Sequence, residues 1–216
     1  MNKKHVLLMF WLTVLLTMLV SATISAEVLV GVSEGDWMEY SVAYTPPDDK
    51  LTWARIEVQS VQARNITIEL TVEYSDGTQE NATTTVDLEA GKLGEGFIIP
   101  ANLTSGDTFY AQSEGNITIS GVEERTYAGA RRTAVYATVS QDTFYWDRPT
   151  GVLVEVSQLF ADYTIKIKAD KTNMWQAQLF GFEPIVFYAL IIAVIVTVAI
   201  VAILVIRRRR SSPLSA

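Results

Sequence analysis

Residues 65–90 read NITIELTVEYSDGTQENATTTVDLEA, and this stretch decides the fold class. Apolar and polar side chains alternate along 66–74, which is typical of a β-strand with one buried face. Asp76-Gly77 predicts a two-residue hairpin turn, because both central positions of such a turn favour positive φ. The alternation resumes after the turn, so we expect an antiparallel hairpin in a mainly β chain.

Similar segments recur on both sides of this hairpin. They lie at 38–44, 51–61, 117–119, 131–139, 143–146, 152–156 and 163–167. The alternation slips near Trp53, which predicts a β-bulge there. Short connections favour antiparallel neighbours. We therefore expect about nine or ten strands in an antiparallel meander, and the sequence leaves a sandwich, a barrel and a curved half-barrel open.

The C-terminal part of the chain holds a long apolar stretch. Residues 185–206 carry no charge, and Arg207, Arg208, Arg209 and Arg210 follow them. As a helix these residues would be about 33 Å long, which is enough to cross a hydrocarbon core of about 30 Å. We expect a transmembrane helix over 184–206, a stop-transfer signal in the four arginines and a short basic tail at 207–216. A cleaved lipid-anchor signal and a lipid-binding arginine cluster are the alternatives.

The N-terminal residues predict a secretory signal peptide over 1–26. A basic start precedes an apolar run at 6–20 and a small polar segment that ends at Ala26. An uncleaved anchor is the alternative. With the positive-inside rule, this layout predicts a type I single-pass protein of the cell membrane with a cytoplasmic C-terminus. The extracellular part would be a β domain at 27–169 and a juxtamembrane stalk at 170–183, with Trp175, Phe180 and Phe182 where an interfacial aromatic belt would be.

Charge and composition exclude several function classes. Residues 27–183 contain all 24 acidic residues and 11 of the 17 Lys and Arg, a formal charge of −13. Such a surface argues against nucleic acid and against close contact with anionic lipid. The chain has no Cys, and its single His is His5, inside the expected signal peptide. Ser-His-Asp and Cys-His catalysis and the usual zinc sites are therefore excluded from the mature domain, and we expect neither a cofactor nor a metal.

Four Asn-x-Thr motifs predict N-glycosylation at Asn65, Asn81, Asn102 and Asn116. Asn173 is the only asparagine of 27–183 outside such a motif. The strand pattern places Asn65, Asn81 and Asn116 on polar faces and Asn102 in a loop, where a glycan would be exposed. The alternative is that Asn-x-Thr merely suits strand edges and turns.

These motifs, the absence of disulfides, the acidic domain and the arginine-ended anchor together resemble the layout of archaeal single-pass cell-surface glycoproteins. A second and looser similarity rests on Tyr145-Trp146-Asp147 and the turn Thr150-Gly151-Val152-Leu153. This segment resembles the curved half-barrel sheets of periplasmic lipoprotein carriers. That resemblance implies a lipid bound on the concave face of the sheet.

Carboxylates offer the remaining catalytic chemistry. Asp142 and Asp147 flank three aromatic residues and could act as the acid pair of a glycan hydrolase, or could be solvated edge-strand residues. Asp48-Asp49 and Glu123-Glu124 could bind Ca²⁺, although neither pair has loop-ligand spacing. Arg131 and Arg132 are neighbours, and on a strand they would face opposite sides.

We therefore expect a non-enzymatic role in binding, adhesion or envelope structure, with a cell-surface protein, glycan or lipid as partner. The main alternative is a carrier or sensor of an apolar ligand on a concave sheet, and a hydrolase is the second. A carrier would need an open pocket lined by the inward-facing set. That set includes Tyr40, Ile68, Leu70, Val135 and Val154.

Overall fold

The computed structural model describes residues 28–46, 51–179 and 181–210. The expected signal peptide, Asp48-Asp49, Phe180 and residues 211–216 lie outside this part of the chain. The described strands are β1 (Trp37–Thr45), β2 (Leu51–Gln62), β3 (Asn65–Tyr74), β4 (Gln79–Asp87), β5 (Thr108–Ala111), β6 (Gly115–Thr118), β7 (Gly121–Tyr127), β8 (Ala130–Val139), β9 (Asp142–Asp147), β10 (Leu153–Leu159) and β11 (Thr164–Thr172). A helix, α2 (Pro184–Arg210), follows them. The prediction of a mainly β chain is confirmed.

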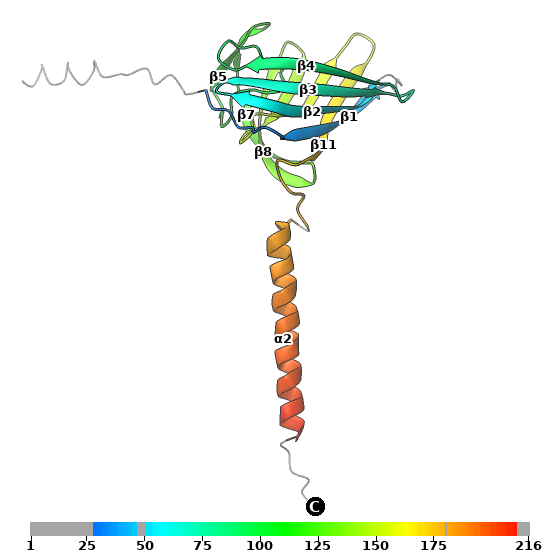
Figure 1. Ribbon diagram of the computed structural model, residues 1–216, viewed down its shortest axis with the longest axis vertical. Helices are drawn as coiled ribbons and strands as arrows, with labels where there is room; N and C mark the ends of the chain where they lie inside the picture. The colour runs from blue at the N-terminus through cyan, green and yellow to red at the C-terminus, as the bar shows by residue number, and fades with distance from the viewer. Residues whose placement is uncertain (1–27, 47–50, 180, 211–216) are drawn as a thin grey trace, which may run out of the picture.

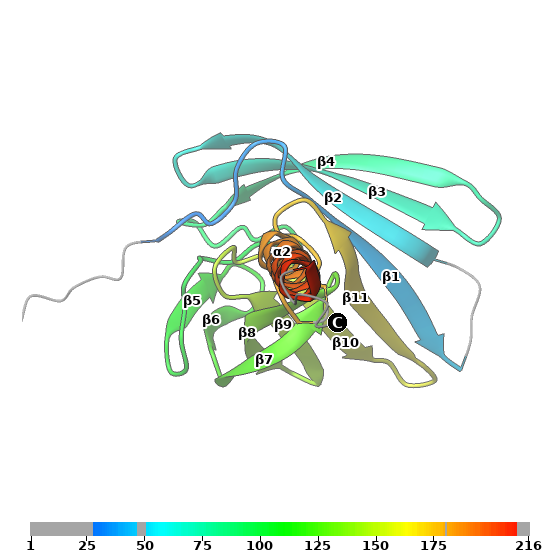
Figure 2. The ribbon, with the colours of Figure 1, turned by 90° about the horizontal axis from the view of Figure 1, so that it is seen from below.

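Nine strands form one antiparallel sheet in the order β4-β3-β2-β1-β11-β10-β9-β8-β7, and β5 and β6 form a separate hairpin. The sheet consists of two meanders, β1–β4 and β7–β11, joined where β1 pairs with β11. β4 and β7 are its two edges, so the sheet is open and does not close into a barrel. It curves strongly, and Figure 2 shows the two meanders facing each other across the domain.

The space between the two meanders is filled by a hydrophobic core. β1–β4 contribute Tyr40, Ile56 and Ile68, and β8–β10 contribute Val135, Trp146 and Val154. Ile98 and Ile99, from the connection after β4, are also fully buried there. Of the inward-facing set expected for a carrier, Tyr40, Ile68, Val135 and Val154 are buried and Leu70 is partly buried in this core.

Two local predictions can be compared with the strand register. The β2–β3 register shifts between Leu51 and Trp53, which confirms the expected bulge. The expected two-residue turn at Asp76-Gly77 is wrong, because Gly77 has positive φ (82°) and Asp76 does not. Instead, the Gly77 N–H donates to the Tyr74 carbonyl, and the Asp76 carboxylate accepts the N–H and the hydroxyl of Thr78. Asp76 thus forms an Asx turn of its own, which lengthens the connection.

A long apolar helix follows the sheet domain. Pro184–Leu204 is 21 residues long. Its most apolar 18-residue stretch has a mean hydropathy of 3.1, and none of that stretch is buried. Figure 1 shows α2 extending away from the domain. Its length and composition suit a membrane anchor.

The segment between β11 and α2 packs against the domain. The Trp175 indole donates to the Tyr127 carbonyl at 3.2 Å, and the Arg132 guanidinium lies 4.4 Å from the Trp175 ring centroid. The Gln178 N–H donates to the Gly129 carbonyl at 2.8 Å. Trp175 is therefore bound to the β7–β8 turn, not free to enter an interfacial belt as the sequence suggested. These contacts place the β7–β8 turn close to the start of α2 (Figure 1).

The buried hydroxyl of Tyr40 provides a test of this core. It donates to the Leu153 carbonyl at 2.9 Å and so links the two meanders. We expect Tyr40→Phe to lower the free energy of unfolding by about 1–2 kcal/mol, because the carbonyl would stay buried without its donor. Denaturant unfolding of the full chain in detergent would measure this. Tyr44→Phe is the control, since Tyr44 is only partly buried, and equal effects of the two substitutions would contradict the prediction.

Candidate ligand cavity

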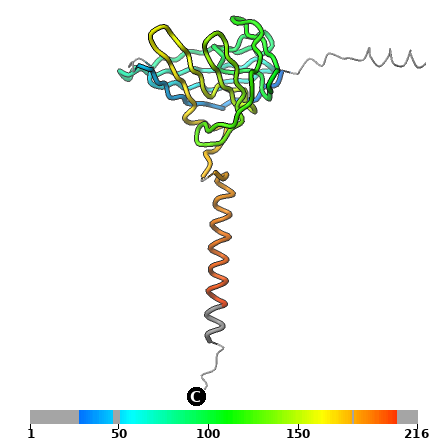
Figure 3. Tube along the Cα trace, turned by 180° about the vertical axis from the view of Figure 1, so that it is seen from behind, coloured from blue at the N-terminus to red at the C-terminus, as the bar shows by residue number. Residues whose placement is uncertain are grey.

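A cavity of about 590 Å³ lies between the loop after β4, the β5–β6 hairpin and the β8–β9 turn. Its lining includes Lys92, Leu93, Glu95, Gly96, Phe109, Gln112, Ser113, Glu114, Ile117, Ser140, Asp142, Phe144, Trp146 and Gln158. In Figures 1 and 3 the β8–β9 and β10–β11 turns point away from α2. We call this space the distal cavity, because it lies at the end of the domain opposite the helix.

The loop 91–96 forms one wall in an unusual backbone conformation. A Cβ on Gly91 would lie 2.5 Å from the Tyr110 ring, so only glycine allows this close approach. Gly94, Glu95 and Gly96 all have positive φ, at 56°, 59° and 81°. Glycine adopts this region without cost, whereas a glutamate is strained there. Strained residues concentrate at functional sites, and Glu95 is such a residue on a cavity wall.

Aromatic side chains form the floor of the distal cavity. Phe144 and Trp146 project from the same face of β9 and stack with centroids 5.6 Å apart and planes 8° apart. Phe109 meets Trp146 edge-on at 5.7 Å. The Trp146 indole donates to the Gly96 carbonyl at 2.8 Å, which ties the floor to the loop. Phe144 remains partly exposed, so a flat apolar group could stack on it.

The polar groups around this floor are mostly acidic. Three carboxylates, Glu95, Glu114 and Asp142, face a single cation, Lys92, a formal charge of −2. Amides and hydroxyls complete the lining at Gln112, Ser113, Ser140 and Gln158. The cavity therefore suits a neutral or positively charged ligand with one flat apolar face, and it disfavours an anion.

An exposed apolar patch adjoins the distal cavity at the β10–β11 turn. Leu159, Phe160 and Tyr163 are 55%, 42% and 37% exposed. The rings of Phe160 and Tyr163 stack at 4.6 Å. The Leu159 N–H donates to the Asp142 carboxylate at 3.0 Å, which joins the patch to the cavity rim. Exposed apolar patches often mark interaction sites.

The two aspartates considered for hydrolysis do not form a pair. Asp142 shares a face of β9 with Phe144 and Trp146, whereas Asp147 lies on the opposite face. Asp147 is fully buried and accepts two hydrogen bonds from Arg132, at 2.8 and 3.0 Å. Arg131 lies on the other face and pairs with Glu124, so the expected divergence of the two arginines is confirmed. Asp147 is a structural ion-pair partner, and the pair cannot flank one glycosidic bond.

The four asparagines of the Asn-x-Thr motifs are all exposed. Asn65 and Asn81 lie on β3 and β4, Asn116 lies on β6, and Asn102 lies in a loop. Asn173 differs: its amide accepts the Trp37 N–H and donates to the Gly35 carbonyl, each at 2.8 Å. The asparagine outside the motifs is therefore a structural residue.

Sequence reasoning also missed the burial of Glu155. Glu155 is 7% exposed, and its oxygens lie 2.9 Å from the Lys166 ammonium, 3.2 Å from the Arg125 guanidinium and 3.1 Å from the Tyr127 hydroxyl. Burial raises the pKa of the Glu155 carboxyl, but its bonds to Lys166, Tyr127 and Arg125 outweigh burial and lower the pKa overall. The alternation along β10 places Glu155 on a polar face, where the side chains of Arg125, Tyr127 and Lys166 contact it.

No protein-family model matches the chain, and no curated protein matches it. In the part of the chain that the structure describes, no three His, Cys, Asp or Glu side chains gather as metal ligands. Glu123 pairs with Arg125 and Glu124 with Arg131, which occupies both members of the Glu123-Glu124 pair. Among the described residues, the distal cavity is the candidate ligand site.

Glu155 predicts a pH dependence of stability. A glutamate in an unfolded chain has a pKa of about 4.3, and the folded value is lower. Its contribution to stability is therefore complete above about pH 5 and is lost as the pH falls through the folded pKa. We expect Glu155→Gln to flatten the fall in melting temperature on acidification. Glu34→Gln, at an exposed position, is the control, and parallel curves for wild type and Glu155→Gln would contradict the prediction.

Proposed function

We propose that the chain is a non-enzymatic binding domain held at a membrane by α2, and that the distal cavity receives its ligand. The observation that carries this proposal is the position of the cavity beside the β8–β9 turn, which points away from the helix (Figure 1). A ligand or partner approaching from solution would meet this end first. The strained Glu95 and the aromatic floor support a binding role for the same space.

The apolar patch at Leu159, Phe160 and Tyr163 extends the proposed site beyond the cavity. A partner could place one small group on Phe144 and cover the patch with a larger surface. Recognition of a protein or a glycan on a neighbouring surface would use both features. Adhesion is therefore the form of binding that we favour.

Two other functions have less support. A carrier with its ligand on the concave sheet would need the space that Tyr40, Ile68 and Val154 occupy. A hydrolase would need two carboxylates about 5–10 Å apart across one bond, and Asp142 and Asp147 lie on opposite faces of β9. The acidic lining of the distal cavity further disfavours an anionic lipid as its ligand.

We also propose that the sheet domain lies outside the cell and carries N-glycans. The charge argument for this orientation is the run Arg207–Arg210, which favours the cytoplasmic side. The exposure of Asn65, Asn81, Asn102 and Asn116 meets the steric requirement for a glycan. A glycan on Asn81 would lie on β4, an edge strand, and would hinder pairing with a second sheet.

Mass spectrometry tests the glycan and orientation proposals together. We expect the protein purified from its own membranes to lose mass on chemical deglycosylation. Replacing each asparagine of the four motifs by glutamine should remove a defined part of that mass, whereas Asn173→Gln should remove none. An unchanged mass after deglycosylation would overturn the glycan proposal and take away the support it gives to the orientation.

Native mass spectrometry of the full chain from its own membranes tests the distal cavity. We expect a non-covalent adduct that Ile117→Trp abolishes, because the larger ring would fill the cavity. Val122→Trp adds the same ring on the edge strand β7, outside the cavity, and should retain the adduct. Glu95→Gly should weaken binding while raising the melting temperature, because glycine relieves the strain at this φ.

Two outcomes would contradict the proposal that the distal cavity binds the ligand. An adduct that survives Ile117→Trp would lie elsewhere on the molecule. If no adduct is found, titration with a panel of saccharides and amines is the second measurement. A panel without any binding would then overturn the cavity as a ligand site.

A further inference from the structure

A second, smaller pocket lies near the helix end of the domain. It has a volume of about 310 Å³ and is lined by Arg125, Thr126, Tyr127, Glu155, Lys166 and Lys168. We call it the basal pocket. β7 and β11 supply most of its walls, and Figure 2, which looks along α2, shows both strands beside the helix axis.

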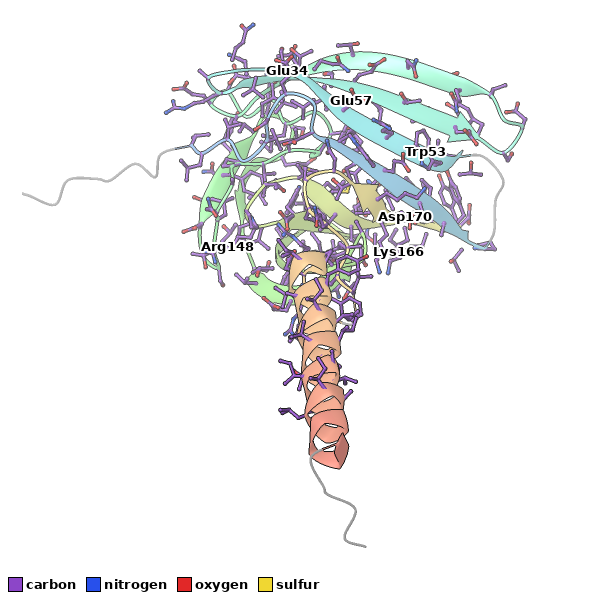
Figure 4. All side chains as sticks on the ribbon, turned by 60° about the horizontal axis from the view of Figure 1, so that its bottom comes forward. Glu34, Trp53, Glu57, Arg148, Lys166 and Asp170 are labelled. Carbon is purple, nitrogen blue, oxygen red and sulfur yellow. The ribbon has the colours of Figure 1, made fainter. Side chains whose placement is uncertain are left out.

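Contacts of the stalk confirm this placement. Trp175, nine residues before the start of α2, donates to the carbonyl of Tyr127, which lines the basal pocket. The β7–β8 turn that follows Tyr127 also binds Gln178 through Gly129. Figure 4 labels Lys166 on β11, the strand after which the chain leads to α2. The pocket therefore adjoins the stalk that leads from the sheet domain to α2.

The basal pocket has an excess of positive charge. Its three cations, Arg125, Lys166 and Lys168, face one carboxylate, Glu155. Arg125 has Glu123 as a further partner, so the excess is at least one charge. The domain as a whole is strongly acidic, with all 24 carboxylates of the chain in 27–183, and the pocket is a local exception.

Of the three cations in the basal pocket, Lys168 is the one that remains available to bind a ligand. Glu155 is already within 3.2 Å of Lys166, Arg125 and Tyr127, which uses its oxygens. The Lys168 ammonium lies 5.7 Å from the Tyr127 ring centroid and has no carboxylate within 4.0 Å among the described residues. Its attraction to the ring face holds the ammonium near the pocket without neutralising it.

The spacing of the lysines suits a phosphate group. Lys166 and Lys168 lie two positions apart on β11 and therefore on the same face, with Cα atoms about 7 Å apart. Their long side chains can converge on the two free oxygens of one phosphodiester. Lysine binds phosphate as a flexible point charge, and two lysines can share one group in this way.

We propose that the basal pocket binds the phosphate of an anionic membrane lipid and so seats the domain on the bilayer. Lys168 supplies the main contact, and Lys166 shares the phosphate while retaining Glu155. The acidic remainder of the domain is repelled by the same lipid surface. The attraction at the base and the repulsion elsewhere would together hold the distal cavity away from the membrane.

The test uses the full chain in nanodiscs of phosphatidylcholine with and without phosphatidylglycerol. Phosphatidylglycerol retained by the protein would be measured by native mass spectrometry and its affinity by titration of the lipid fraction. We expect Lys168→Gln to weaken retention about fivefold, the scale of one lysine near a lipid surface. Lys168→Arg should restore it, because the charge is kept.

Lys171→Gln is the matched control. It removes the same charge from the same strand, but Lys171 pairs with Glu39 and does not line the basal pocket. We expect its effect on retention to be small. Equal losses in Lys168→Gln and Lys171→Gln would show unspecific attraction and overturn the proposal. Melting temperatures of the variants establish that each is folded.

A competition experiment distinguishes lipid binding from the binding of soluble anions. Inorganic phosphate and glycerol phosphate are added in millimolar excess to the phosphatidylglycerol nanodiscs. We expect neither to displace the lipid, since the anchor holds the pocket at the bilayer surface. Displacement by soluble phosphate would identify a general anion site and overturn the lipid as the ligand.

Discussion

The pairing of the first strand with the last is the constraint on which the rest of this structure depends. β1 and β11 are hydrogen-bonded from Met38–Thr172 to Thr45–Thr164, across more than 110 residues of chain. Each meander alone would expose the apolar face that now forms the core. The pairing turns two local meanders into one sheet and brings the Tyr40 hydroxyl to the Leu153 carbonyl. It also fixes the end of β11, and with it the point where the chain leaves for α2.

The sequence predicted what local chemistry determines. Alternation along 66–74 identified β3, and the slip near Trp53 identified a real register shift. The strand order could not be predicted from the sequence. The β1–β11 pair is non-local, and the two meanders could have paired through other outer strands. The prediction of a two-residue turn at Asp76-Gly77 was wrong because the N–H and the hydroxyl of Thr78 both donate to the Asp76 carboxylate, which favours a longer turn.

The sites were harder to predict than the strands. Strand parity correctly placed Asn65, Asn81 and Asn116 at exposed positions, because exposure on a strand is a local property. The distal cavity combines a loop, a hairpin and a turn that are distant in sequence, and 91–96 alone reads only as a glycine-rich connection. Asp147 was considered as a solvated acid, yet it and Glu155 are both buried, and each pairs with an arginine. Arg132 reaches Asp147 from the neighbouring strand β8, whereas Arg125 reaches Glu155 from β7, three positions along the sheet from β10, and such a non-local contact cannot be predicted from a residue pattern.

The separation of the two pockets follows from topology. The helix continues from the end of β11, so the β10–β11 turn, at the start of that strand, must lie at the opposite end. β9 runs parallel to β11, because each is antiparallel to β10, and the β8–β9 turn therefore points the same way. The β8–β9 turn borders the distal cavity and the β10–β11 turn carries the adjoining apolar patch, whereas the β7–β8 turn points toward α2 and binds Trp175. Any antiparallel meander anchored after its last strand would present alternate turns away from the anchor, and here those turns carry the cavity and the aromatic patch.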